Sequence, residues 1–206
     1  DKKNFELTMQ AQHTVFGNGS AGSPFKGYAP GEYRSPESEK KNEKNFEPGR
    51  VWDFAVKAGG SLTEKWPLGS FKEDGYHLRV YGPNGLFREF AGNAKDPQIL
   101  IGCDYQRNRL IKNKLTGNIE LKISNQDKSH SYNIEIADNG YKNKPVSKKI
   151  APGGEETIVL DLNKSYGWHD FSNNIKENPG FTKRYAGRVE TGKESYSDPV
   201  MGGINI

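Results

Sequence analysis

Residues 75–90 read Gly-Tyr-His-Leu-Arg-Val-Tyr-Gly-Pro-Asn-Gly-Leu-Phe-Arg-Glu-Phe. In the first half of this stretch, Tyr76, Leu78 and Val80 alternate with polar side chains, which is typical of a half-buried β-strand. In the middle, residues 82–85 (Gly-Pro-Asn-Gly) favour a tight turn, because proline presets φ and Asn-Gly accepts positive φ. The stretch therefore predicts a β-hairpin.

Similar segments recur in the second half of the chain and keep the same order. Residues 88–92 (Arg-Glu-Phe-Ala-Gly) match residues 183–187 (Lys-Arg-Tyr-Ala-Gly), and the middle strands of the two halves align best when Leu78 corresponds to Phe171. Such internal similarity predicts two repeated units. The further matches are residues 4–7 with 118–121 and the glycine turns 56–60 with 150–154.

Each unit contains several short strands with frequent turns, which predicts an all-β fold of two small β-sandwich domains in tandem, immunoglobulin-like in type. We place the first repeat at residues 1–96 and the second at 97–206, with Asp96-Pro97 as the junction. The first unit is longer, and its surplus lies in a segment rich in Gly, Pro, Ser, Glu and Lys. We therefore expect a long loop insertion at about 17–49.

The composition excludes several classes of protein. With 24 Gly, 11 Pro and 33% hydrophobic residues among 206, a long helical bundle is excluded, and no apolar run approaches the length of a membrane-spanning helix. The formal net charge is +4 with the two signs interspersed, so nucleic-acid binding by a basic stripe is not expected. A single cysteine, Cys103, excludes an internal disulfide.

No catalytic pattern is found in the chain. The four histidines (His13, His77, His130 and His169) show no spacing typical of a metal site. The acidic pairs Glu73-Asp74 and Glu155-Glu156 adjoin glycine turns, where carboxylates are usually solvated. We therefore expect no catalytic residue, no metal site and no cofactor in this segment.

Aromatic residues near turns are the remaining candidates. We single out Trp66, Trp168, Phe87 and Phe181 as possible lipid or ligand contacts, because such rings stack on sugars or lie at lipid interfaces. The competing interpretation, which carries more weight, is that most of these rings form the cores of small sandwiches.

Residues 75–90 resemble the first C-terminal repeat of the bacterial phosphocholine-preferring phospholipases C, in which a YDLxVxGPNGFxRxF run is typical. The chain departs from this run at His77, where the family has Asp, and at Leu86-Phe87, where one extra residue precedes the arginine. Residues 167–171, 179–187 and 188–201 are similar to the partner repeat and to the closing segment of the family. The resemblance is strong over about 52–92 and 150–201 and weaker over the first fifty residues.

The resemblance implies non-catalytic C-terminal repeats of a secreted or periplasmic enzyme that hydrolyses phosphatidylcholine, and in some members sphingomyelin, to release phosphocholine. Its implied partners are an upstream catalytic domain of the same chain and a phospholipid membrane surface, with no nucleic acid. The repeats would support structure, substrate access or membrane docking. Two alternatives stay open: a carbohydrate-binding or adhesion-type pair of β-sandwiches, and a fragment that is itself an enzyme.

Overall fold

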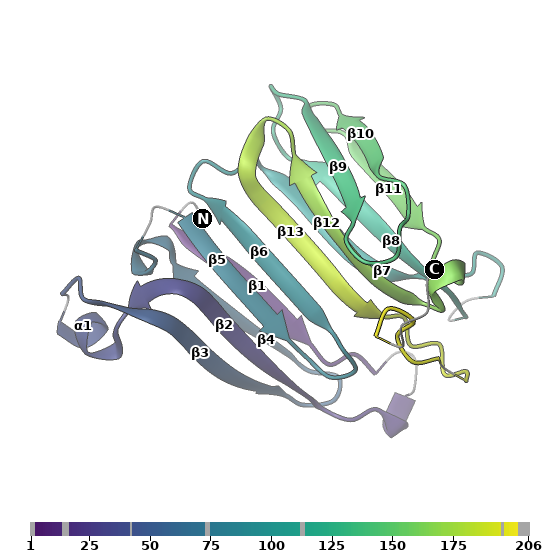
Figure 1. The fold of residues 1–206 in the computed structure, drawn as a ribbon, viewed down its shortest axis with the longest axis horizontal. Helices are drawn as coiled ribbons and strands as arrows, with labels where there is room; N and C mark the ends of the chain where they lie inside the picture. The colour runs from purple at the N-terminus through teal and green to yellow at the C-terminus, as the bar shows by residue number, and fades with distance from the viewer. Residues whose placement is uncertain are drawn as a thin grey trace. The chain divides into compact units, whose positions relative to one another are not determined.

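The computed structural model describes residues 3–13, 17–41, 43–72, 75–111, 114–194 and 196–201, and β-strands dominate it (Figure 1). The chain divides into two compact units, Asp1–Asp96 and Pro97–Ile206. The prediction of an all-β sandwich fold is confirmed. None of the helices in the described ranges is long and apolar enough to cross a membrane.

The first unit contains two antiparallel sheets. Strand β1 pairs with β4, and the other sheet has the order β6-β5-β2-β3 within this unit. A short α-helix, α1, lies between β2 and β3, and a 3-10 turn, η2, follows β4. The bounds are β1 Asn4–Gln10, β2 Ser23–Arg34, α1 Pro36–Lys41, β3 Phe46–Val56, β4 Ser61–Pro67, η2 Leu68–Ser70, β5 Gly75–Tyr81 and β6 Phe87–Asn93, with a further 3-10 turn, η1, at Gly17–Gly19.

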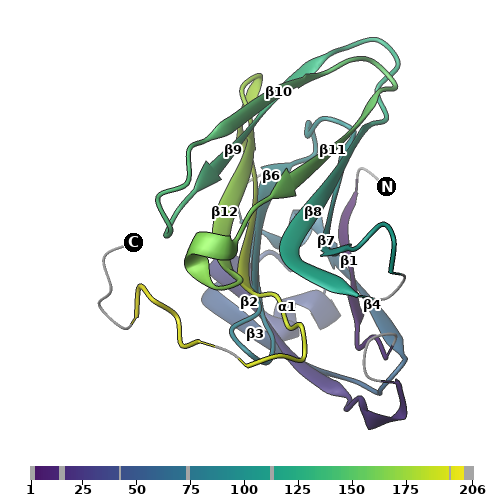
Figure 2. The same ribbon diagram turned by 90° about the vertical axis from the view of Figure 1, so that its right-hand side faces the viewer.

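The second unit also consists of two sheets, which form two layers (Figure 2). One has the order β11-β8-β7 and the other, within this unit, the order β10-β9-β12-β13. A 3-10 turn, η3, separates β11 from β12. The bounds are β7 Ile99–Arg107, β8 Leu115–Asn125, β9 Tyr132–Asp138, β10 Val146–Ile150, β11 Glu155–Leu160, η3 Asn163–Ser165, β12 Trp168–Ile175 and β13 Asn178–Arg188.

The two units share one pairing order. Strands β1 to β6 of the first correspond in turn to β8 to β13 of the second, and β7 is an additional strand. The register also agrees, because Leu78 of β5 lies opposite Phe90 of β6, and Phe171 of β12 lies opposite Tyr185 of β13.

Period-two alternation builds each core. In β5, Tyr76, Leu78 and Val80 are buried, while their neighbours in the strand are half-buried or exposed. In β8, Ile119, Leu121 and Ile123 have at most 1% of their surface exposed. Removing a side chain of this size from water contributes about 1.5–3 kcal/mol. The hydrophobic alternation seen in the sequence is therefore what holds the sheets face to face.

The expectation of a loop insertion at about 17–49 is wrong. Most of this segment forms a β-hairpin, in which β2 pairs with β3 from Ser23↔Val56 to Arg34↔Phe46, with α1 in the connection. The hairpin looks like a loop in sequence because Gly27 occupies a buried position of β2, where a Cβ atom would approach the Phe54 ring to 3.2 Å. Close packing against that ring favours glycine here, and glycine obscures the alternation.

The turn at residues 82–85 has the backbone that the sequence predicts. Asn84 and Gly85 have φ of 57° and 74°, and the Gly82 amide donates to the Leu86 carbonyl at 2.8 Å.

We predict that Gly85→Val lowers the free energy of unfolding by about 1–2 kcal/mol, because a β-branched residue is strained in the left-handed region. Thermal unfolding followed by circular dichroism measures this loss. Gly31→Val is the matched control, since Gly31 has no positive φ and open space around it. A melting temperature for Gly85→Val equal to that of the unmodified chain would contradict the turn.

Candidate functional site

Two of the four aromatic residues singled out in the sequence are buried. Trp66 on β4 is 2% exposed and lies in an aromatic cluster, with ring centroids 5.7 Å from Trp52 and 6.1 Å from Phe5. Phe181 on β13 is also 2% exposed. These two side chains therefore belong to the hydrophobic cores of their units, which agrees with the competing interpretation of the aromatic residues.

Phe87 and Trp168 are half-buried and stay candidates. Phe87 begins β6, and its ring lies 5.2 Å from that of Tyr81 across the turn. Trp168 begins β12, and its indole N–H donates to the Tyr196 carbonyl at 2.9 Å. The Tyr196 ring in turn packs against Tyr166, with centroids 4.5 Å apart. Both tyrosines are exposed, so aromatic surface is available beside Trp168.

The connection between β7 and β8 carries two exposed aliphatic side chains. Leu110 is 93% exposed, the highest value among the large hydrophobic side chains that the structure describes, and Ile111 is 53% exposed. The Asn108 side-chain oxygen accepts hydrogen bonds from the backbone amides of Leu110 at 2.8 Å and Ile111 at 3.0 Å. The Asn108 amide donates to the Lys114 carbonyl at 2.8 Å. This Asx-type turn holds both aliphatic side chains toward solvent.

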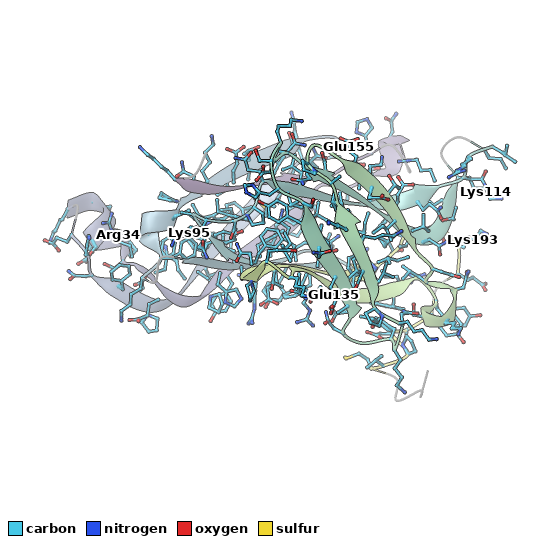
Figure 3. The ribbon with its side chains drawn as sticks, turned by 90° about the horizontal axis from the view of Figure 1, so that it is seen from above. Arg34, Lys95, Lys114, Glu135, Glu155 and Lys193 are labelled. Atoms are coloured by element: carbon cyan, nitrogen blue, oxygen red, sulfur yellow. The ribbon has the colours of Figure 1, made fainter. Side chains whose placement is uncertain are left out.

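Strand pairing brings the β7–β8 connection and the tyrosine pair to the same end of the second unit. Leu160, the last residue of β11, lies opposite Ile119 of β8, and the Leu162 amide donates to the Asn118 side chain at 3.1 Å. The chain that follows β13 also reaches this end, where Figure 3 shows Lys114 and Lys193. We call this end the tip surface and define it by its exposed residues Arg107, Arg109, Leu110, Ile111, Lys114, Tyr166 and Tyr196.

Positive charge is locally in excess at the tip surface, as it also is at residues 142–149 (Lys-Asn-Lys-Pro-Val-Ser-Lys-Lys). Residues 107–114 (Arg-Asn-Arg-Leu-Ile-Lys-Asn-Lys) contain four basic residues, and no acidic residue occurs from 105 to 119. The other 26 basic and 26 acidic residues of the chain balance each other. The net charge of the whole chain does not reveal this segment, because it averages over regions in which the two signs balance. A charge count in short windows, combined with the adjacent Leu-Ile pair, would have found it.

A cleft of about 200 Å³ lies in the second unit, between the ends of β9 and β11 and the start of β12. Its apolar lining includes Ile136, Leu160 and Phe171, and its acidic lining includes Asp138 and Asp170. Ligand pockets are usually larger, about 300–1,000 Å³.

The cleft's carboxylates are engaged within the fold. Asp138 accepts from the amides of Gly140 at 2.8 Å and Tyr141 at 2.6 Å and from the Asn143 side chain at 2.6 Å. Asp170 accepts from Arg184 Nε at 2.8 Å and Nη2 at 2.6 Å. These hydrogen bonds give both carboxylates a structural role, in which they hold the chain that follows β9 and join β12 to β13.

The protonation of Asp170 follows from these contacts. Burial raises the pKa of the Asp170 carboxyl, but hydrogen bonds from Arg184 and Asn139 and the charge of Arg184 lower it by more. The pKa of Asp170 therefore lies below its ordinary value, and the carboxylate stays ionised at neutral pH.

His77 belongs to a side-chain network on β5 and β6. His77 Nε2 lies 2.8 Å from Glu89 Oε1, which also accepts from Arg79 Nε at 2.7 Å. Burial raises the pKa of Glu89, and the bonds from His77 and Arg79 lower it by more. Within the described part of the chain, no three or more His, Cys, Asp or Glu side chains are grouped to hold a metal ion. Glu73-Asp74 lies outside the described residues.

His130 belongs to a local turn network. Its Nδ1 lies 3.0 Å from Asp127 Oδ2. The Ser129 amide, helped by the Tyr132 and His130 side chains and the His130 amide, lowers the pKa of Asp127 to about 2. This network shapes the turn between β8 and β9 and has the character of a structural cap.

We predict that Asp170→Asn destabilises the chain by about 1–3 kcal/mol at pH 7, because Arg184 loses a charged acceptor that is only partly exposed. The pKa of Asp170 is lower in the folded state than in the unfolded state, so its contribution is present above about pH 4 and lost as the pH falls below that value.

Urea unfolding at several pH values measures this contribution. The stability gap between the unmodified chain and Asp170→Asn should narrow from pH 5 to pH 2. Asp53→Asn is the matched control, because the Asp53 side chain is 76% exposed in its pair with Lys26. A gap that stays constant with pH would contradict the ion pair.

The chain matches the protein family described as "Bacterial phospholipase C, C-terminal domain" over residues 2–93 and again over residues 100–188. It is 31% identical over 158 residues to "Non-hemolytic phospholipase C" of Burkholderia pseudomallei, covering 73% of this chain and 21% of that protein. It is 31% identical over 128 residues to "Non-hemolytic phospholipase C" of Pseudomonas aeruginosa, covering 62% of this chain and 18% of that protein. It is 34% identical over 135 residues to "Hemolytic phospholipase C" of the same organism, covering 61% and 17%. The chain thus spans about a fifth of the length of these relatives.

Among solved structures, red sea bream transglutaminase matches at 10% identity with a TM-score of 0.26, covering 93% of this chain and 29% of that chain. A TM-score of this size supports no argument about fold or function.

Proposed function

The chain belongs to the bacterial phospholipase C C-terminal domain family, and from this membership we propose that it is the non-catalytic C-terminal part of an enzyme that hydrolyses phosphatidylcholine to phosphocholine and diacylglycerol. The observation that carries the proposal is that the two matched segments fall on the two compact units, one on each. The relatives are named phospholipase C, and the aligned part of this chain covers only 17–21% of their length. Their extra length leaves room for a separate catalytic domain.

We assign the two units a supporting role beside that catalytic domain, which is their first partner. The acidic side chains of the cleft support this assignment, because they are engaged in hydrogen bonds that hold the fold. We assign the tip surface a second role, which is docking on the phospholipid surface. A phospholipase has to bind that surface because its substrate is part of it. One relative is named hemolytic, and because lysis of red cells takes place outside the bacterium, this name supports a secreted location.

The carbohydrate-binding or adhesion alternative has less support. A sugar platform needs an exposed aromatic face, and Trp66 is part of a core. Trp168 is half-buried and its indole N–H is already used by the Tyr196 carbonyl. Exposed tyrosines remain at the tip surface, but exposed aliphatic and basic side chains lie at the same end of the second unit, which fits a lipid surface better than a neutral sugar.

We predict that the full-length protein releases phosphocholine from phosphatidylcholine vesicles and that the 206-residue chain alone releases none. The reason is that the chain supplies structure and docking while another domain supplies the chemistry. A choline-coupled assay measures release, and cooperative thermal unfolding of the 206-residue chain serves as the control that it is folded.

Two different outcomes would contradict two different parts of the proposal. Release by the folded 206-residue chain would show that the chain is catalytic. Absence of release by the full-length protein would show that phosphatidylcholine is not its substrate.

A further inference from the structure

We propose that the tip surface docks the enzyme on a phospholipid bilayer that contains anionic lipid, with Leu110 and Ile111 entering the interface. This inference rests on the proposed function, because it names the surface through which the phospholipase would meet its substrate. Three independent features of the second unit carry it: exposed aliphatic side chains, a local excess of positive charge, and interfacial aromatic rings.

The aliphatic side chains are presented in a form suited to insertion. Leu110 is 93% exposed and Ile111 53%, and neither is needed by the core of the second unit. The two hydrogen bonds from their backbone amides to Asn108 Oδ1 fix the turn in advance. Entering the acyl boundary therefore removes apolar surface from water without the cost of ordering the turn.

The charge around these side chains suits an anionic surface. Arg107, Arg109 and Lys114 flank Leu110 and Ile111 on both sides and are exposed. Long basic side chains can keep their charged ends at the headgroups while neighbouring apolar groups go deeper. Anionic lipid attracts each such residue near the surface, an effect that falls off within a Debye length.

The aromatic rings supply the third feature. Tyr166 and Tyr196 are 46% and 61% exposed, and Trp168 lies beside them. Trp and Tyr are enriched at membrane–water interfaces, where their amphipathic rings reside at headgroup level. Trp168 thus keeps the lipid-contact role suggested for it in the sequence, here as a neighbour of the tip surface.

Charge also argues against a second copy of the chain as the occupant. A two-fold contact between identical tips would bring the basic patch of Arg107, Arg109 and Lys114 against the same basic patch of the other copy. The exposed aliphatic area is confined to two side chains, whereas a stable interface buries about 800 Å² on each partner. An anionic bilayer does not repel the basic side chains, because its charge is opposite to theirs. It also needs no matching protein interface, because it is an extended surface.

The test is co-sedimentation of the full-length protein with vesicles on ice, where hydrolysis is slow. The vesicles are phosphatidylcholine alone or phosphatidylcholine mixed with phosphatidylserine, at low and at physiological salt. The unmodified protein should bind the mixed vesicles more tightly, and salt should weaken this binding. Leu110→Ser with Ile111→Ser should weaken binding to both vesicles by about tenfold or more. Arg107→Gln and Arg109→Gln should each weaken binding to the mixed vesicles by about fivefold at low salt.

Matched controls come from the other end of the second unit. Leu100→Ser changes a side chain that is 60% exposed at the start of β7, and Lys128→Gln changes an exposed lysine in the turn between β8 and β9. The Gln126 amide donates to the Gln98 carbonyl at 2.7 Å, which places both controls together and away from the tip surface. Both should bind vesicles as the unmodified protein does. Thermal unfolding of every variant checks that it is folded.

The outcomes separate this inference from the proposed function. Sedimentation needs no turnover, whereas release of phosphocholine from a soluble ester by the unmodified enzyme tests the proposed function alone. The inference is overturned if the folded tip variants bind as tightly as the unmodified protein, or if the unmodified protein binds neither vesicle. It is also overturned if the tip variants dissociate a dimer seen by analytical ultracentrifugation, which would assign the surface to a second copy.

Discussion

Leu78 has no exposed surface, and its burial against the opposite sheet is the interaction on which the first unit depends. It lies on a central strand, opposite Phe90, and Phe171 lies opposite Tyr185 in the same relation in the second unit. Successive side chains of a strand point to opposite faces of its sheet. Burying the apolar face of one strand therefore determines how its neighbours must be aligned with it. A slip of one residue would turn the apolar face of β5 toward water.

Because the strand registers are fixed, the connections between strands begin and end at defined positions. The β7–β8 connection starts and ends on paired residues, and Arg107 lies opposite Leu115 before Asn108 closes the turn. The side chains at its tip therefore project from a sheet that the core holds in place. The same logic explains why the acidic residues of the second-unit cleft are structural: loops without strand partners need side-chain acceptors for their backbone amides.

Much of the fold follows from local pattern, and the failures have specific physical causes. The hairpin at residues 75–90 and the strands at residues 4–10 and 115–125 were predictable from alternation and from the Pro-Asn-Gly turn. The strand pair at residues 23–56 was not, because Gly27 is buried against the Phe54 ring and breaks the apolar pattern. The burial of Trp66 could not be decided from its position next to a turn, because that position does not show which face of a strand a ring occupies.

The sequence by itself determined the all-β class, the turn chemistry and the family, since these depend on alternation, on glycine and proline, and on motif order. Only the tertiary structure decided which aromatic rings are buried and which segments lie at the same end of the second unit. Leu110 and Tyr196 are far apart in the chain, and pairing of β8 with β11 and of β12 with β13 brings their segments to one end. Strand pairing is non-local, because it depends on packing between sheets, and no local pattern encodes it.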